Sequence, residues 1–222
     1  MATSGTTNFT LNIVEAIEEA YERVGVEARG GYQFRTARRS IDLMMLDWQN
    51  RGLNLWTIDS GTIPLVSGTE TYSLPTDTVD LIETVFRPDS GSDRILRRLS
   101  VSDYSSLPNK SQTGVPNTAY VDRSTTPEVT FWPVPTGSTP GTFVYWRLRR
   151  IEDSGTTGSN TMDMPARFLP AFVAGLAYYL AQKVPEAFPR IPTLEAAYEK
   201  EWRNASEEDR SRVSFTIMPQ LS

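Results

Sequence analysis

An uncharged and strongly apolar run lies between Arg167 and Lys183, with apolar side chains pointing in every direction around a helical axis. A helix that is apolar all round must be covered on all sides, so it lies in a protein core or in lipid. The run is shorter than the ~20 residues that span a bilayer, and Pro170 interrupts it. The pattern therefore predicts a buried central helix within residues 165–184. Pro170 either kinks this helix or marks its true start.

Two amphipathic helices are predicted before this run. Asn12 and Glu15 have the spacing of a capping box at the start of the first helix, and Gly25 is a natural stop. The second helix covers roughly residues 33–50, and Gly52 closes it. The apolar stripes at helical spacing comprise Ile13, Val14, Ile17, Tyr21 and Val24 in the first helix, and Ala37, Ile41, Met44, Met45 and Trp48 in the second. Both helices are expected to pack against the central one.

A last amphipathic helix is predicted from about Thr193, after a Pro-rich turn over residues 185–192. Its core stripe comprises Leu194, Ala197, Tyr198, Trp202 and Ala205. Glu199 and Arg203 form a favourable i,i+4 pair on its surface. Ser, Gly and Thr over residues 154–160 predict a flexible connector that leads back to the helices from the middle of the chain.

The pattern changes in residues 53–151, where helical spacing gives way to short alternating apolar runs separated by Pro, Gly, Thr and Ser. Alternation with a period of two predicts strands, most clearly over residues 142–150, and residues 66–69 read as a hairpin turn. The predicted strands are 63–65, 71–74, 81–87, 94–99, 119–122, 129–132 and 142–148. Residues 102–107 are expected to form a single helical turn.

These elements predict an α+β protein, an antiparallel helical bundle with an inserted small antiparallel β domain and an extended C-terminal arm. The predicted boundaries are 9–52 for the first helical pair, 53–153 for the β domain, 161–209 for the second helical pair and 210–222 for the arm. In the arm, Val213, Phe215 and Ile217 alternate as in a strand, yet no element remains to receive them. An apolar tail of this kind is a candidate for docking on another subunit.

The amino-acid composition excludes several classes of chemistry for this protein. The chain has 222 residues, a net charge of −5, no cysteine and no histidine. Disulfides, thiol chemistry and histidine-based acid–base or metal chemistry are therefore excluded. The negative net charge gives no general basic field for tight DNA binding. The first residues, Met-Ala-Thr-Ser-Gly-Thr-Thr-Asn, have neither the basic region nor the apolar core of a signal peptide, so a cytoplasm-like compartment is expected.

The sequence predicts no catalytic residue, cofactor site or metal site. Acidic neighbours occur at Glu18–Glu19, Glu152–Asp153 and Glu207–Asp209, but each is expected on a solvated helix surface or in a loop. Two arginine groups are candidates for contact with DNA or a partner, although a solvated face explains them about as well. They comprise Arg35, Arg38 and Arg39 in the second helix, and Arg94, Arg97 and Arg98 in the β region.

The order of several short motifs resembles the head-to-tail adaptor proteins of short-tailed bacteriophages, a group that includes packaged-DNA-stabilisation, tail accessory and tail-tubular proteins. The motifs are Leu46-Asp-Trp48 with Gly52-x-x-Leu55-Trp56, Tyr72-x-Leu74-Pro75, Tyr104-x-x-Leu107-Pro108-Asn-Lys110, Gly114-x-Pro116, Trp132-Pro-Val-Pro135, Pro165-x-Arg167-Phe168 and Tyr198-x-x-x-Trp202. Each motif alone is weak, and their order along one chain carries the resemblance over about residues 9–219.

The resemblance implies a structural virion protein without enzymatic activity. Such adaptors form a ring, expected to be a dodecamer, beneath the portal protein. The ring extends the DNA channel, retains packaged double-stranded DNA without sequence specificity and supports a tail nozzle or hub protein. The implied portal-binding arm comprises Arg210, Arg212, Val213, Phe215, Ile217 and Met218. The implied location is the head–tail junction of the virion, with assembly in the host cytoplasm and no membrane partner. The alternative is a virion-associated carbohydrate-binding or wall-degrading protein that uses the β domain.

Overall fold

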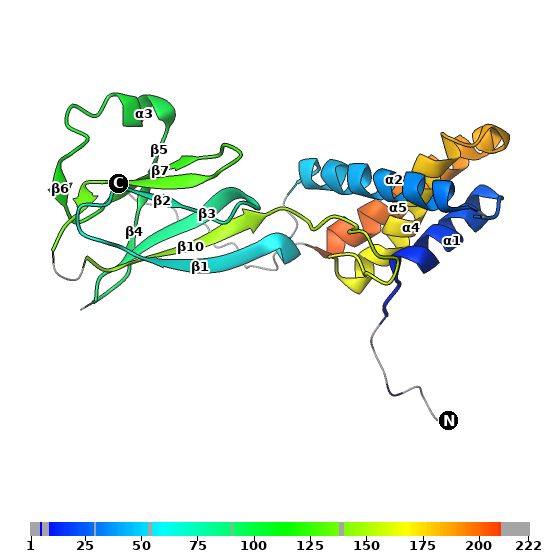
Figure 1. The fold of residues 1–222 in the computed structure, drawn as a ribbon, viewed down its shortest axis with the longest axis horizontal. Helices are drawn as coiled ribbons and strands as arrows, with labels where there is room; N and C mark the ends of the chain where they lie inside the picture. The colour runs from blue at the N-terminus through cyan, green and yellow to red at the C-terminus, as the bar shows by residue number, and fades with distance from the viewer. Residues whose placement is uncertain are drawn as a thin grey trace, which may run out of the picture. The chain divides into compact units, whose positions relative to one another are not determined.

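The computed structural model describes residues 5, 9–28, 30–52, 55–89, 91–137 and 140–209. Their contacts divide the chain into two compact units, and each has a hydrophobic core of its own. Met1–Trp56 and Ile151–Ser222 form the first, called the helical unit here, and Thr57–Arg150 forms the second, called the β unit. Helices and mostly antiparallel sheets make the protein α+β, as predicted (Figure 1). The predicted arm, residues 210–222, lies outside the described residues.

Among the described residues, four α-helices build the helical unit, and α4 is its central element, as predicted for the apolar run. The helices are α1 (Ile13–Val24), α2 (Gly31–Asn50), α4 (Leu169–Ala181) and α5 (Ile191–Glu208). Short 3-10 helices are η1 (Leu55–Thr57), η2 (Ala166–Phe168) and η3 (Pro185–Arg190). Figure 1 shows α4 among α1, α2 and α5. No helix in the described ranges is long and apolar enough to cross a membrane.

The ends of α1 follow the predicted capping chemistry. The Asn12 side chain accepts a hydrogen bond from the Glu15 backbone N–H at 2.9 Å, and the Glu15 carboxylate accepts from the Asn12 backbone N–H at 2.9 Å. These reciprocal bonds satisfy two N–H groups that the first helical turn cannot pair. At the other end, Gly25 has a φ of +91° and its N–H bonds to the carbonyls of Tyr21 and Glu22. Both boundaries of the first predicted helix are confirmed.

Close packing around α4 explains its small residues. Pro170 lies in the first turn of α4, so the prediction that it marks the true start is confirmed. A Cβ atom built on Gly175 would lie 2.5 Å from the Met44 sulfur and 2.7 Å from a ring carbon of Tyr198. Only glycine therefore lets α2 and α5 approach α4 this closely. Leu176 faces the same core and is fully buried.

An aromatic cluster joins α2 to α5. The Trp48 indole N–H donates a hydrogen bond of 2.7 Å to the Tyr198 hydroxyl, and the ring centroids of Trp48 and Trp202 lie 4.6 Å apart. Burial raises the pKa of Tyr198. Because the Trp48 N–H and the Tyr198 hydroxyl are hydrogen-bonded to each other inside the core, these two large side chains are buried with their polar atoms paired.

Two four-stranded sheets build the β unit. Their strands are β1 (Ile58–Pro64), β2 (Thr71–Ser73), β3 (Thr78–Arg87), β4 (Arg94–Ile95), β5 (Arg97–Leu99), β7 (Thr118–Asp122), β8 (Glu128–Trp132) and β10 (Thr142–Arg149). One sheet has the order β1-β10-β3-β4, and the other has the order β2-β8-β7-β5. A small third sheet pairs β6 (Thr113–Gly114) with β9 (Val134–Pro135), and α3 (Val101–Ser105) is the predicted helical turn. Phe143 of β10 meets Phe131 of β8 at a centroid distance of 4.8 Å, so both main sheets contribute to one core.

Several predictions for the β region are wrong in their pairing. Residues 66–69 do form a turn, but β1 and β2 on either side belong to different sheets, so no hairpin forms there. The predicted strand 94–99 is divided at buried Leu96 into β4 and β5, which also belong to different sheets. The pairs β5–β7 and β6–β9 are parallel, so the β unit is not wholly antiparallel.

Other corrections concern the helical unit. The predicted Pro-rich turn is largely the 3-10 helix η3, and α5 begins at Ile191 rather than Thr193. Ala197 is exposed rather than in the core stripe, and Glu199 accepts a hydrogen bond of 3.0 Å from Arg51 rather than pairing with Arg203 as predicted. The connector over residues 154–160 was predicted to be flexible, but its backbone is tied to α1 and α2. The Ile13 N–H bonds to the Asn160 carbonyl at 2.9 Å, and the Ser154 N–H bonds to the Asp42 carboxylate at 3.0 Å.

Candidate functional site

The three candidate arginines of α2 do not form one cluster. Arg35 and Arg39 are exposed and lie four residues apart, so they share one side of the helix. Arg38 is half-buried, and its guanidinium donates a hydrogen bond to the Thr156 carbonyl. Arg38 therefore holds the connector against α2, while Arg35 and Arg39 face solvent and are open to a partner.

A hollow with a volume of about 650 Å³ lies beside Arg39. It is lined by Tyr21, Tyr32, Gln33, Thr36, Arg39, Leu43, Lys183 and Val184. The Lys183 ammonium donates a hydrogen bond of 2.6 Å to the Ser40 hydroxyl. Burial, and then the charge of Arg39, lower the pKa of Lys183. The lining carries two cations and no carboxylate. We call Tyr32, Arg35, Arg39, Leu43 and Lys183 the basic face.

A second hollow, of about 610 Å³, has the opposite charge. Its lining comprises Phe9, Leu11, Glu15, Glu18, Glu19, Glu22, Arg23, Ala166, Leu169, Pro170 and Val173. The apolar floor comes from the segment before α1 and from the start of α4, and the α1 glutamates form the rim. Arg23 pairs with Glu19 at 2.8 Å, which leaves the rim strongly negative. We call Phe9, Glu15, Glu18, Glu19 and Glu22 the acidic face. The acidic face was not predicted, although the 15-18-19-22 spacing of its glutamates indicates one side of a helix.

The candidate arginines of the β unit are divided between its two main sheets. Arg94 lies in β4, whereas Arg97 and Arg98 lie in β5. Arg98 pairs with the Asp80 carboxylate at 2.5 Å and donates to the Leu81 carbonyl at 3.0 Å. Arg94 and Arg97 are exposed. Arg98 is exposed as well, but its contacts link β5 to β3.

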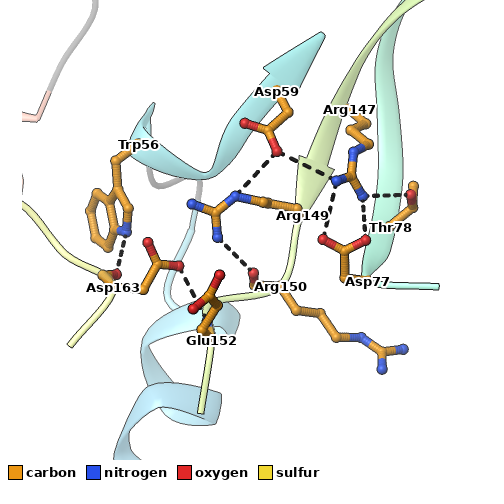
Figure 2. Close-up of polar contacts among 9 residues, drawn as sticks. All are labelled: Trp56, Asp59, Asp77, Thr78, Arg147, Arg149, Arg150, Glu152 and Asp163. Carbon is orange, nitrogen blue, oxygen red and sulfur yellow. Dashed lines mark hydrogen bonds and ion pairs between the residues drawn. The ribbon is translucent and has the colours of Figure 1, made fainter. Parts of the chain in front are cut away.

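A polar network that no sequence pattern predicted surrounds Arg147 of β10, and Figure 2 shows it in close-up. The Arg147 guanidinium contacts Asp77 at 2.6 and 3.1 Å, Thr78 at 3.0 Å and Asp59 at 3.4 Å, and its side chain is only 12% exposed. Arg149 also contacts Asp59, at 3.3 Å. The hydrogen bonds from Arg147 hold the pKa of Asp77 below its ordinary value. Because Asp59 lies in β1 and Thr78 in β3, the network ties β10 to both neighbouring strands and has a structural role.

The end of α5 is fixed by Asp209, which the sequence analysis placed on a solvated surface. Asp209 is instead buried, pairs with Arg167 of η2 and accepts a hydrogen bond of 2.9 Å from the Leu55 backbone N–H. Figure 2 also shows, within the helical unit, the Trp56 indole N–H donating to the Asp163 carbonyl at 3.0 Å. The arm residues Arg210, Arg212, Val213, Phe215, Ile217 and Met218 follow this anchored end but lie outside the described residues.

Among the described residues, no three His, Cys, Asp or Glu side chains are arranged to hold a metal ion. The acidic neighbours Glu18 and Glu19 belong to the acidic face on α1, and Glu152 and Asp153 lie exposed just before the connector. The helical unit thus carries two hollows of opposite charge, one beside the acidic face and one beside the basic face.

A family model described as SU10 adaptor protein matches residues 7–218, which is nearly the whole chain and includes both units. No curated protein matches the chain.

Proposed function

The chain belongs to the SU10 adaptor protein family, and on that premise we propose that it is a structural virion protein that connects the head of a bacteriophage to its tail. The observation that carries this proposal is the extent of the family match, residues 7–218. Membership confirms the resemblance to phage head-to-tail adaptors that the order of motifs predicts, and it implies a location in the virion.

The proposed architecture is an antiparallel helical bundle with the β unit inserted between its two helical pairs. In support, α1 and α2 share one core with α4 and α5, although about a hundred residues separate the two pairs in sequence. The domain limits that we propose are 9–52, 53–153 and 161–209. The unit boundaries at Trp56–Thr57 and Arg150–Ile151 lie within four residues of both limits of the β domain, whereas the second helical pair begins ten residues after Ile151. The arm, residues 210–222, would extend from the anchored end of α5.

The proposed assembly is a ring of identical subunits, a dodecamer in our proposal, that binds below the portal protein. The ring would extend the DNA channel, retain packaged DNA and carry the tail nozzle or hub. The arm would grip the portal through main-chain hydrogen bonds and alternate apolar side chains. Assembly would occur in the host cytoplasm. A closed ring needs two unlike faces on one subunit, and the opposite charges of the basic and acidic faces of the helical unit support this proposal.

Sedimentation of the purified protein with and without the portal protein of the same virus tests this function. We expect the protein to co-sediment with portal rings in a fixed, saturating ratio, because a ring has a defined number of sites. A protein that leaves portal rings unbound, but binds polysaccharide or degrades the cell wall, would instead support the alternative virion-associated carbohydrate-binding or wall-degrading role.

The proposed contact with DNA is weak and independent of sequence, since a channel wall must let DNA slide. Arg94, Arg97 and Arg98 are the proposed contacts in the β unit, and Arg35, Arg38 and Arg39 are the proposed contacts with DNA or a partner in the helical unit. Arg94 and Arg97 are exposed and suited to phosphate contacts, whereas Arg98 is already paired with Asp80.

Reversing the charge of Arg94, Arg97 and Arg98 should therefore weaken DNA retention or change the rate of DNA ejection in assembled particles. The measurement is the fraction of particles that keep their DNA after a mild heat challenge. Binding of the free protein to short duplexes should stay weak for both variant and wild type, because few phosphates are neutralised. Tight, sequence-selective binding by the isolated protein would contradict this proposal.

A further inference from the structure

The hollows beside the acidic and basic faces of the helical unit are similar in size and opposite in charge. The acidic face has a hollow of about 610 Å³ with four glutamates and one arginine in its lining, and that arginine is already paired. The basic face has a hollow of about 650 Å³ whose lining has Arg39 and Lys183 and no carboxylate, with exposed Arg35 one turn away on α2. A surface of one sign is complementary to a partner surface of the other sign.

Each face also exposes large apolar side chains. Phe9 on the acidic face is 75% exposed, and on the basic face Tyr32 is 69% and Leu43 58% exposed. Apolar groups gathered in a hollow and rimmed by charge mark a surface that a partner covers. The apolar floor would supply affinity, and the charged rim would set orientation and exclude wrong partners.

The two faces draw most of their residues from different elements. The acidic face is built on α1, η2 and the start of α4, and α2 contributes nothing to its lining. The basic face is built mainly on α2, with Lys183 and Val184 just after α4, and Tyr21 is the one residue of α1 in the lining of its hollow. A contact between the acidic face of one copy and the basic face of the next is therefore heterologous, and repetition of a heterologous contact generates a ring when the rotation closes.

We propose that the basic face of one copy of this chain docks on the acidic face of the next, and that this contact joins neighbouring subunits. Arg35 and Arg39 then lie opposite Glu18 and Glu22, and Phe9 packs against Tyr32 and Leu43. The proposal rests on the ring of identical subunits proposed above and identifies the surfaces that form it. The occupant of each hollow is a second copy, because the complementary charge and apolar groups both occur on this same chain.

Charge reversal tests the contact. Glu18→Arg with Glu22→Arg makes the acidic face basic, and Arg35→Glu with Arg39→Glu makes the basic face acidic. Each double variant should lose self-association by at least about tenfold, because like charges then meet at every contact. An equimolar mixture of the two should regain it, since the reversed face of one variant is complementary to the reversed face of the other, and their unreversed faces are complementary as well. The chain carrying all four substitutions should also regain it.

The readout is sedimentation velocity, with and without portal rings, after thermal midpoints show that every variant folds. Glu83→Arg with Glu207→Arg, and Lys200→Glu with Arg203→Glu, change the net charge equally at exposed sites outside both faces and should leave association unchanged. Reversed variants that associate like wild type, or a mixture no better than its components, would show that subunits meet elsewhere. That result leaves the portal-binding function intact.

Disulfide trapping gives an independent measurement, because the native chain has no cysteine. Glu22→Cys and Arg39→Cys on separate copies should yield a cross-linked dimer on oxidation, whereas Glu22→Cys with Lys200→Cys should not. Equal yields from both pairs would contradict the docking. A wild-type chain that stays monomeric and unbound even with portal rings would contradict both this contact and the proposed ring.

Discussion

Leu176→Asp is expected to unfold most of the helical unit. Leu176 is fully buried in α4, and α4 packs against α1, α2 and α5. The substitution removes a core side chain, which costs about 2–5 kcal/mol, and it buries a carboxylate among apolar neighbours without a partner. Since a folded protein of this kind has a total stability of about 5–15 kcal/mol, the combined cost is a large share of it.

The measurements are helicity by circular dichroism and the midpoint of urea unfolding. Leu176→Met keeps the volume and should cost less than about 1.5 kcal/mol. Leu46→Asp places the same charge on an exposed position of α2, 53% accessible, and should have little effect. A Leu176→Asp protein with wild-type helicity and midpoint would show that α4 is not the central element of the core.

The sequence predicted the helices well because their signals are local. The capping box of Asn12 and Glu15 and the stop at Gly25 lie within one or two turns of the residues they organise, and they fix α1 without knowledge of the rest of the chain. The buried stripe of α2 follows directly from helical spacing. The prediction that Ala197 lies in the core was wrong. An apolar stripe predicts which side of a helix is buried, but the width of the buried surface depends on the elements that pack against that helix.

The positions of the strands were predicted better than their pairing. A turn over residues 66–69 is a local property, but whether it joins paired strands depends on distant segments, and β1 pairs with β10 while β2 pairs with β8. Most of β1 was missed because Ser60-Gly61-Thr62 lacks an apolar alternation. Gly61 lies against the ring of Tyr145, a close approach that only the fold reveals.

The candidate surfaces were predicted least well. Six arginines were grouped by proximity in sequence, yet Arg38 and the exposed Arg98 are engaged in contacts within the fold, while Arg35, Arg39, Arg94 and Arg97 are exposed. The two hollows each combine segments that are far apart in sequence, such as Phe9 with Val173. Their complementarity is a tertiary property, so a single sequence could not reveal it.

Deleting the chain after Arg212 is expected to abolish binding to the portal while leaving the melting temperature unchanged. The deletion keeps Asp209, which pairs with Arg167 and caps the end of the fold by accepting from the Leu55 N–H at 2.9 Å. It removes Val213, Phe215 and Ile217, whose alternation suits an added strand on a partner. The alternative is an arm that folds back onto its own β domain.

Point substitutions distinguish the contribution of the arm's side chains to portal binding from the contribution of its length. In a strand, successive side chains point to opposite faces, so Phe215→Asp with Ile217→Asp should remove portal binding, whereas Ser214→Asp with Thr216→Asp adds the same charge on the other face and should retain most of it. Co-sedimentation with portal rings measures binding, and the thermal midpoint measures the fold. If the truncated protein instead melts well below wild type in isolation, the arm packs on the fold of its own subunit. The loss of portal binding would then follow from instability of the subunit rather than from the loss of a portal-binding segment.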